Sequence, residues 1–213
     1  MSETHNGHDH PHEEIKAGAE SGLYAGRIRA IEALLVERGI LTQEEVQSQI
    51  EYMEARSPAN GARLVARAWI DSEFKIRLLS DTKAAARELG MDASGPVELV
   101  TVENTPEVHN LIVCTLCSCY PRAILGRPPD WYKSFAYRSR AVNEPRAVMR
   151  EFGLDLPISV TIAVHDSSAD IRYMVLPMRP SGTEGMGEEE LARLVTRDSL
   201  IGVSVPLEPV LAG

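Results

Sequence analysis

Hydrophobic positions near the start of the chain recur every three or four residues, which is the period of an amphipathic helix. The first stripe contains Ile28, Ile31, Leu34 and Leu35, and Gly39 follows as a helix stop. This stripe is narrow, and the neighbouring sequence offers little apolar surface against which it can pack. We therefore expect the first helices to bury their apolar side on another chain.

Further helical signals continue to about residue 92. The sequence Thr-Gln-Glu-Glu at 42–45 is a capping box, in which the Thr42 hydroxyl and the Glu45 carboxylate each accept a hydrogen bond from a free backbone N–H. It opens a helix that breaks near Pro58, and shorter helical segments follow. Their apolar residues are Val46, Ile50, Met53, Val65, Ala68, Trp69, Phe74, Leu78 and Leu79. Residues 21–92 are therefore predicted to form a helical arm that wraps a partner chain.

After residue 92 the pattern changes to that of β-strands. The expected strands are residues 97–102, 108–113, 160–164 and 171–175, with a turn at 104–106 between the first two. We expect residues 165–170 to join the last two strands as a hairpin. Helices near 145–152 and 188–195 would cover the faces of the strands. The fold class predicted for residues 93–213 is therefore α+β.

The remaining segment, residues 1–20, is polar and rich in His, Glu and Gly, and is expected to be disordered. Its histidines are His5, His8, His10 and His12. They alternate with other residues and have no scaffold to organise them, so a solvated tail is favoured over a metal site.

Composition and charge narrow the class of protein. The chain has 213 residues, of which 44% are hydrophobic and 25% charged, which is typical of a globular protein. The net charge of −9 and the lack of a basic stripe argue against a nucleic-acid partner. The sequence contains no run of about 18 apolar residues, so no membrane span is predicted. The N-terminus lacks the features of a signal peptide. Clustered cysteines without a disulfide framework favour the cytoplasm.

All three cysteines of the chain lie in the hexapeptide Cys-Thr-Leu-Cys-Ser-Cys at residues 114–119. A turn at this spacing can direct the sulfurs of Cys114, Cys117 and Cys119 to one point, together with the peptide nitrogens of Ser118 and Cys119. Soft thiolates select a transition metal over Mg²⁺ or Ca²⁺. Five donors leave a sixth position for water or substrate, and such an open position is typical of a catalytic metal.

Other interpretations of the same cysteines remain open at this point. A structural zinc site needs a fourth side-chain ligand, and His109 is the nearest candidate. A disulfide between Cys114 and Cys117 would leave Cys119 unpaired. Three buried, inert thiols are also conceivable, because a free cysteine packs as a small hydrophobic residue, although this does not explain their crowding.

The hexapeptide and its flanks, Val113 to Tyr120, resemble the metal claw of the nitrile hydratase α subunit, and the similarity covers roughly residues 20–203. The other similar segments are residues 102–105, 125–133, 137–140, 175–177, 179–180 and 194–202. The resemblance implies a layered α/β/β/α catalytic domain with small sheets, preceded by an extended helical arm. It also implies that the protein is an enzyme, a hydro-lyase that converts nitriles to amides.

The resemblance further implies the metal and its ligands. Thr115 and Tyr120 match the non-corrinoid Co³⁺ type, and Fe³⁺ is the less favoured alternative. Cys114 would remain a thiolate, Cys117 would be a sulfinic acid and Cys119 a sulfenic acid, with Ser118 as a ligand through its backbone nitrogen. Cys117, Ser118, Cys119 and Tyr120 are the implied catalytic residues, and Tyr120 either positions the substrate or forms the wall of the pocket.

The resemblance implies partners as well. These are a β subunit, forming an αβ heterodimer that pairs to α2β2, an activator protein that delivers the metal, and a small neutral nitrile as substrate. Two arginines of the β subunit would hold the oxidised cysteines. Two alternatives remain open: the metal-bearing subunit of a cobalt thiocyanate hydrolase, and a non-catalytic interaction or leader domain of the same fold. The intact claw counts against the second.

Overall fold

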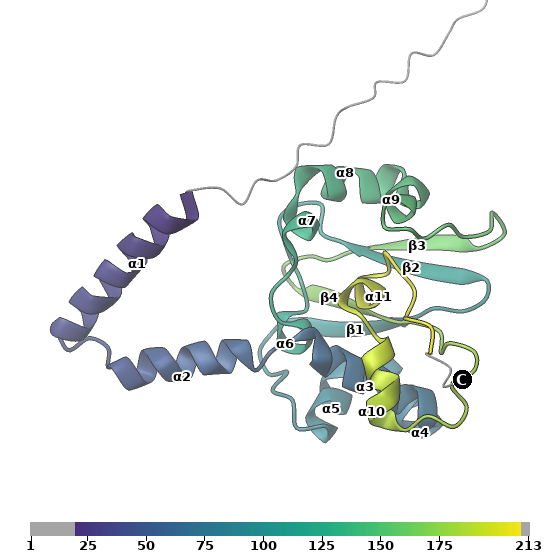
Figure 1. Ribbon diagram of the computed structural model, residues 1–213, viewed down its shortest axis with the longest axis horizontal. Helices are drawn as coiled ribbons and strands as arrows, with labels where there is room; N and C mark the ends of the chain where they lie inside the picture. The colour runs from purple at the N-terminus through teal and green to yellow at the C-terminus, as the bar shows by residue number, and fades with distance from the viewer. Residues whose placement is uncertain (1–19, 210–213) are drawn as a thin grey trace, which may run out of the picture. The chain divides into compact units, whose positions relative to one another are not determined.

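The structure is a computed structural model that describes residues 20–209 (Figure 1). The predicted tail and its four histidines lie outside the described residues. In chain order the elements are α1 (Glu20–Glu37), α2 (Gln43–Glu54), α3 (Pro58–Ile70), α4 (Ser72–Ser80), α5 (Thr82–Glu88), β1 (Glu98–Glu103), β2 (Val108–Val113), α6 (Arg122–Leu125), α7 (Asp130–Lys133), α8 (Phe135–Asn143), α9 (Pro145–Glu151), β3 (Thr161–Asp166), β4 (Ile171–Leu176), α10 (Glu188–Leu194) and α11 (Arg197–Ile201). This is the α+β class expected from the sequence.

The chain divides into two compact units, Met1–Ile50 and Glu51–Gly213. In the first unit, α1 leaves its apolar stripe in solvent, and Ile28 and Ile31 are 63% and 59% exposed. The capping box of α2 forms as predicted, because the Thr42 backbone N–H donates to Glu45 Oε2 at 2.8 Å and the Glu45 N–H donates to Thr42 Oγ1 at 3.1 Å. The start of α2 is thus fixed by a local signal, and none of its residues is buried.

The helices α3, α4 and α5 belong to the second unit, so the structural division falls near residue 50, whereas the arm predicted from the sequence extends to residue 92. Leu64 and Val65 of α3 and Phe74 and Leu78 of α4 are buried in the main hydrophobic core. The apolar face of α3 is broad enough to be covered on several sides, unlike the narrow stripe of α1. Burial of such side chains stabilises the fold by about 1.5–3 kcal/mol each.

The four predicted strands are present, but they pair differently from the prediction. β1 pairs in parallel with β4, and β2 pairs in parallel with β3. The predicted hairpin of β3 and β4 is therefore wrong, because these strands lie in separate two-stranded sheets. The last three residues of β4 and the last five of β2 are buried. Continuous burial of this kind is typical of parallel strands that are covered on both faces.

Helices cover the paired strands from several directions (Figure 1). α8 packs on β2 and α9 on β3, whereas α4 and α5 pack on β1, and α11 packs on β4 and β2. The helices predicted near 145–152 and 188–195 are confirmed as α9 and α10. None of the helices in residues 20–209 is both long and apolar enough to cross a membrane.

The close packing of α11 on β2 depends on one glycine. Gly202 ends α11 with a φ angle of +92°, and a Cβ atom placed on it would lie 2.0 Å from the backbone oxygen of Asn110 in β2. The Gly202 carbonyl also accepts a hydrogen bond from His109 Nε2 at 2.7 Å. This contact fixes the strand that leads directly into the cysteine hexapeptide.

Candidate metal centre

The cysteine loop begins where β2 ends. Leu111, Ile112 and Val113 are fully or almost fully buried, and Cys114 follows them with 0% exposure. The loop then turns outwards, so that Cys117 is exposed and Cys119 is half-buried. A rigid strand thus presents one sulfur from inside the core, and the turn brings the other two back towards it.

The three cysteine sulfurs form one cluster. The Sγ atoms of Cys114 and Cys117 are 3.5 Å apart, and those of Cys117 and Cys119 are 3.1 Å apart. All three lie within 4.8 Å of one another and are free thiols. In the described part of the chain, these cysteines alone form a group with the side-chain spacing of a metal site. The structure therefore brings the sequence-predicted sulfur ligands together.

Backbone groups also turn towards the sulfurs. The Cys117 N–H donates to Cys114 Sγ at 3.3 Å. Hydrogen bonds from the thiols of Cys119 and Cys114, and from the backbone of Ser118 and Cys119, lower the pKa of the Cys117 thiol to about 7. Burial, with the neighbouring thiols, raises the pKa of Cys119 to about 12. The loop thus stabilises a thiolate at Cys117.

Two side chains from distant elements hold the loop in place. Asp166, at the end of β3, accepts hydrogen bonds from the Thr115 N–H at 2.9 Å and the Thr115 hydroxyl at 2.6 Å. Arg138, in α8, donates to the carbonyl oxygens of Thr115 at 3.5 Å and Cys117 at 3.2 Å. Sequence reasoning missed both residues. Parallel pairing of β2 with β3 places Asp166 opposite Val113, directly before the cysteine loop. The sequence pattern placed Asp166 in a hairpin between β3 and β4 instead, so it did not predict this contact.

Tyr120 lines the interior side of the loop. It is 4% exposed, and its ring packs edge-on against Tyr132 with the centroids 5.1 Å apart. Burial raises the pKa of Tyr120. Its hydroxyl is buried without a hydrogen-bond partner in the described residues. The ring is therefore part of the wall, while the hydroxyl has hydrogen-bonding capacity left for another group.

Aromatic side chains around Tyr120 form a rigid support. Tyr132 is fully buried, and its hydroxyl donates to the Cys119 carbonyl at 2.9 Å. Trp131 packs against Tyr137 and Phe152 with ring centroids 4.8 and 4.7 Å away. Offset and edge-on ring pairs stabilise a core beyond their buried area. These rings fix the C-terminal side of the cysteine loop.

His109 does not supply a fourth ligand for zinc. It is 4% exposed, and both ring nitrogens are occupied, Nε2 by the Gly202 carbonyl at 2.7 Å and Nδ1 by the Asn104 side-chain amide at 3.2 Å. Burial lowers the pKa of His109, which favours the neutral ring with a proton on Nε2. Its role in the structure is to join β2 to the end of α11.

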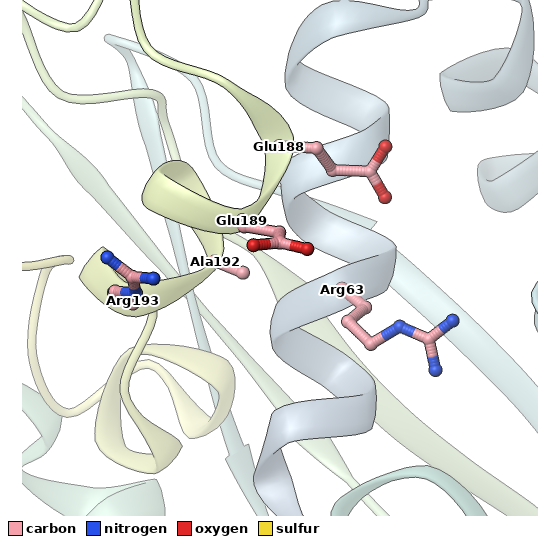
Figure 2. Close-up of a pocket in the computed structure, with 5 residues that line it drawn as sticks. All are labelled: Arg63, Glu188, Glu189, Ala192 and Arg193. Atoms are coloured by element: carbon pink, nitrogen blue, oxygen red, sulfur yellow. The ribbon is translucent and has the colours of Figure 1, made fainter.

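A separate surface pocket lies between α3 and α10 (Figure 2). Its lining is Arg63, Glu188, Glu189, Ala192 and Arg193. Glu188 is paired with Arg67 at 2.7 Å, and Arg63 donates to the Leu89 carbonyl at 3.2 Å. Glu188 and Arg63 thus contact neighbouring parts of the fold, and the lining contains no thiol or imidazole to bind a transition metal.

A cluster of three thiols at the end of a buried parallel strand defines a metal-binding protein of the α+β class. Comparison with known proteins then identifies the family. The sequence model of the nitrile hydratase α chain matches residues 23–204, and this chain belongs to that family. The resemblance inferred from the sequence is thus confirmed over nearly the same span.

Individual relatives agree with this assignment. The α subunit of the low-molecular weight cobalt-containing nitrile hydratase of Rhodococcus rhodochrous is 53% identical over 186 residues, which is 87% of this chain and 90% of that one. The thiocyanate hydrolase γ subunit of Thiobacillus thioparus is 43% identical over 188 residues, covering 83% and 77% of the two chains. A double mutant of the Fe-type nitrile hydratase of Comamonas testosteroni Ni1 superposes with a TM-score of 0.82 at 45% identity, covering 90% and 96%.

Proposed function

We propose that this chain is the metal-bearing α subunit of a nitrile hydratase, which adds water to a small neutral nitrile and releases the amide. The observation that carries the proposal is the cluster of three cysteine sulfurs within 4.8 Å of one another at the end of β2. The donor set fits a transition metal, because thiolates are soft ligands. Among residues 20–209, no fourth side-chain ligand joins the cluster, which supports a site that stays open to substrate.

The proposed ligands are the sulfurs of Cys114, Cys117 and Cys119 and the peptide nitrogens of Ser118 and Cys119. We assign Co³⁺ rather than Fe³⁺ because Thr115 and Tyr120 match the cobalt type and a cobalt-containing relative is 53% identical. The Fe-type neighbour, at 45% identity, makes metal analysis the necessary test. When bound, the ion supplies a Lewis acid that makes the nitrile carbon more electrophilic or a water more acidic.

Residues of this chain would accept the proton that the attacking water releases. Cys119 is proposed to carry a sulfenate, whose oxygen accepts a proton from the attacking water or itself attacks the nitrile carbon. In the first route, the water oxygen bonds to the nitrile carbon, the nitrile nitrogen gains the proton, and the imidic acid rearranges to the amide. In the second route the nitrile nitrogen gains a proton, and water then cleaves the S–O–C link, which releases the amide and restores the sulfenate. Cys117 would be the sulfinate, and Cys114 stays a buried thiolate. The free hydroxyl of Tyr120 is suited to orient the substrate.

A β subunit would complete the site. The exposed stripe of α1 supports this, because Ile28 and Ile31 remain in solvent in the isolated chain. Charged sulfur oxygens that are removed from water need strong donors, and arginines from another chain provide forked ones. We therefore propose an αβ heterodimer, paired as α2β2, that receives its metal from an activator protein in the cytoplasm.

A second candidate function is supported by the 43% identity to a thiocyanate hydrolase γ subunit. That enzyme would require the same cysteine loop, so the loop cannot separate the two functions. Assays of the co-purified complex on an aliphatic nitrile and on thiocyanate distinguish them. Amide formation with no turnover of thiocyanate supports nitrile hydration, and the reverse result supports the alternative.

The metal test uses the chain expressed with its partner subunit in cobalt-supplemented medium. We expect about one cobalt per α chain, and mass spectrometry of the peptide containing residues 114–119 should find two added oxygens on Cys117 and one on Cys119. Stoichiometric iron, or zinc held by four ligands, would contradict the cobalt assignment.

A further inference from the structure

Arg138 contacts the cysteine loop at two peptide carbonyls, and the shorter of the two contacts is with Cys117. Its Nη1 donates to the Cys117 carbonyl at 3.2 Å and to the Thr115 carbonyl at 3.5 Å. The Cys117 carbonyl and the Ser118 nitrogen belong to the same peptide bond. Arg138 therefore holds one end of the peptide whose other end is a proposed metal ligand.

Peptide planarity transmits this contact to the nitrogen. The peptide bond is planar, and in its trans form the carbonyl oxygen and the N–H point in opposite directions. A donor that fixes the oxygen on one side thereby turns the nitrogen to the other side. Because Arg138 Nη1 lies 3.2 Å from the Cys117 oxygen, the Ser118 nitrogen of the same peptide points away from the guanidinium.

The helix that carries Arg138 is firmly attached to the strand that carries the cysteines. Tyr137, the preceding residue, is buried, and its hydroxyl donates to the Ile112 carbonyl in β2 at 2.6 Å. The Ser134 side chain caps the start of α8 by accepting from the Tyr137 N–H at 3.1 Å. The guanidinium is thus held relative to the loop by a capped helix and a buried tyrosine.

We propose that Arg138 is a positioning residue that presets the Ser118 peptide nitrogen for the metal, an inference that rests on the proposed function. The acceptors of Arg138 are carbonyl oxygens of the loop, so its positive charge lies beside the oxygen of the ligating peptide. A peptide nitrogen that binds a cation passes negative charge to its carbonyl oxygen, where the guanidinium stabilises it. The expected consequence is slower loss of metal.

The test compares three variants of the complete complex. Arg138→Gln removes the charge and shortens the side chain, and Arg138→Lys keeps the charge but not the forked donor. Arg140→Gln is the matched control, because Arg140 lies on the same helix and pairs with Glu144 and Glu151 rather than with the loop. Each is expressed with the partner subunit and cobalt. The measurements are metal content, the rate of cobalt loss to EDTA, the sulfur-to-metal absorption band and the melting temperature without metal.

We expect Arg138→Gln to lose cobalt at least about ten times faster than the Arg140→Gln control and to shift the absorption band, with Arg138→Lys in between. A merely structural role would lower the melting temperature without moving the band. Equal metal retention in Arg138→Gln and Arg140→Gln overturns the inference, and so does failure of both Arg138 variants to assemble. If the wild-type complex binds no transition metal, the proposed function fails as well, so the two failures are distinguishable.

Discussion

The three cysteines differ in their surroundings although they lie within six residues of one another. Cys114 is fully buried, Cys119 is half-buried and Cys117 is exposed. Oxidation follows thiolate character and access, so the ordinary chemistry of cysteine favours Cys117 over Cys114. This order agrees with a buried thiolate at Cys114 and the most highly oxidised sulfur at Cys117, as the proposed function requires.

Substitution of Cys119 tests its proposed part in the chemistry. Cys119→Ala removes a metal ligand and the sulfenate oxygen together, so turnover should fall by more than the 10²–10³ typical for loss of one stabilising group. Leu116→Ala is a control in the same loop, because Leu116 is 86% exposed. Rates of amide formation and cobalt content are measured for both variants. Full cobalt occupancy with more than about a tenth of wild-type activity in Cys119→Ala would refute the role.

His109 should make stability depend on pH. Burial lowers the pKa of its ring in the folded state, so below the unfolded pKa of about 6.5 the unfolded chain binds a proton that the folded chain does not. Stability is therefore lost as the pH falls through this value, by up to about 1.4 kcal/mol per pH unit. Denaturant midpoints at pH 7 and pH 5 should differ less in His109→Gln than in wild type. An unchanged difference would contradict this prediction.

At the level of elements, the glycine that ends α11 should be one of the least tolerant positions. Gly202→Ala meets the Asn110 oxygen at 2.0 Å in addition to its positive φ angle. Gly90→Ala is the matched control, since Gly90 has a φ of +75° but no heavy atom within 4 Å of the added Cβ. The control should cost about 1–2 kcal/mol for the left-handed backbone, and Gly202→Ala about 1–3 kcal/mol more for the clash. Equal unfolding free energies for the two variants would show that β2 adjusts freely.

Local signals in the sequence predicted most of the helices and strands, but they did not predict which strands pair with each other. The capping box at Thr42 and Glu45 depends on residues three apart, so the sequence alone was enough to predict it. Alternating apolar residues show which face of a strand is buried but not which strand lies beside it. For that reason the β3–β4 hairpin was wrong, and the contact of Asp166 with Thr115 could not be anticipated. The three cysteines were predicted together because they are neighbours in the chain.

At the level of the whole molecule, α1 is expected to contribute to the interface with the β subunit. Ile31→Glu places a charge on its exposed stripe, and Ile158→Glu is a control at a site that is 90% exposed outside the arm. We expect Ile31→Glu to weaken the αβ complex at least about tenfold, because a charge in an apolar contact stays unpaired. Light scattering after size-exclusion chromatography, with titration of the partner, gives the affinity. Deletion of residues 1–20 should leave it unchanged.

The apolar stripe of α1 would need another explanation if Ile31→Glu did not weaken the complex. Equal affinities for Ile31→Glu and Ile158→Glu would mean that the stripe of α1 is covered by something other than the β subunit. A monodisperse and fully active α monomer would overturn the proposed heterodimer altogether.

The parallel pairing of β2 with β3 has a consequence for biosynthesis. When the ribosome has made the cysteine loop, the strand that pairs with β2 and the Asp166 carboxylate that holds Thr115 are still about 40–50 residues from being translated. The glycine that fixes His109 comes later still, at residue 202. Contacts between distant segments form only after both segments have emerged. The thiols are therefore synthesised before the strand, the carboxylate and the glycine that hold their loop, so the folded cysteine cluster is a property of the nearly complete chain.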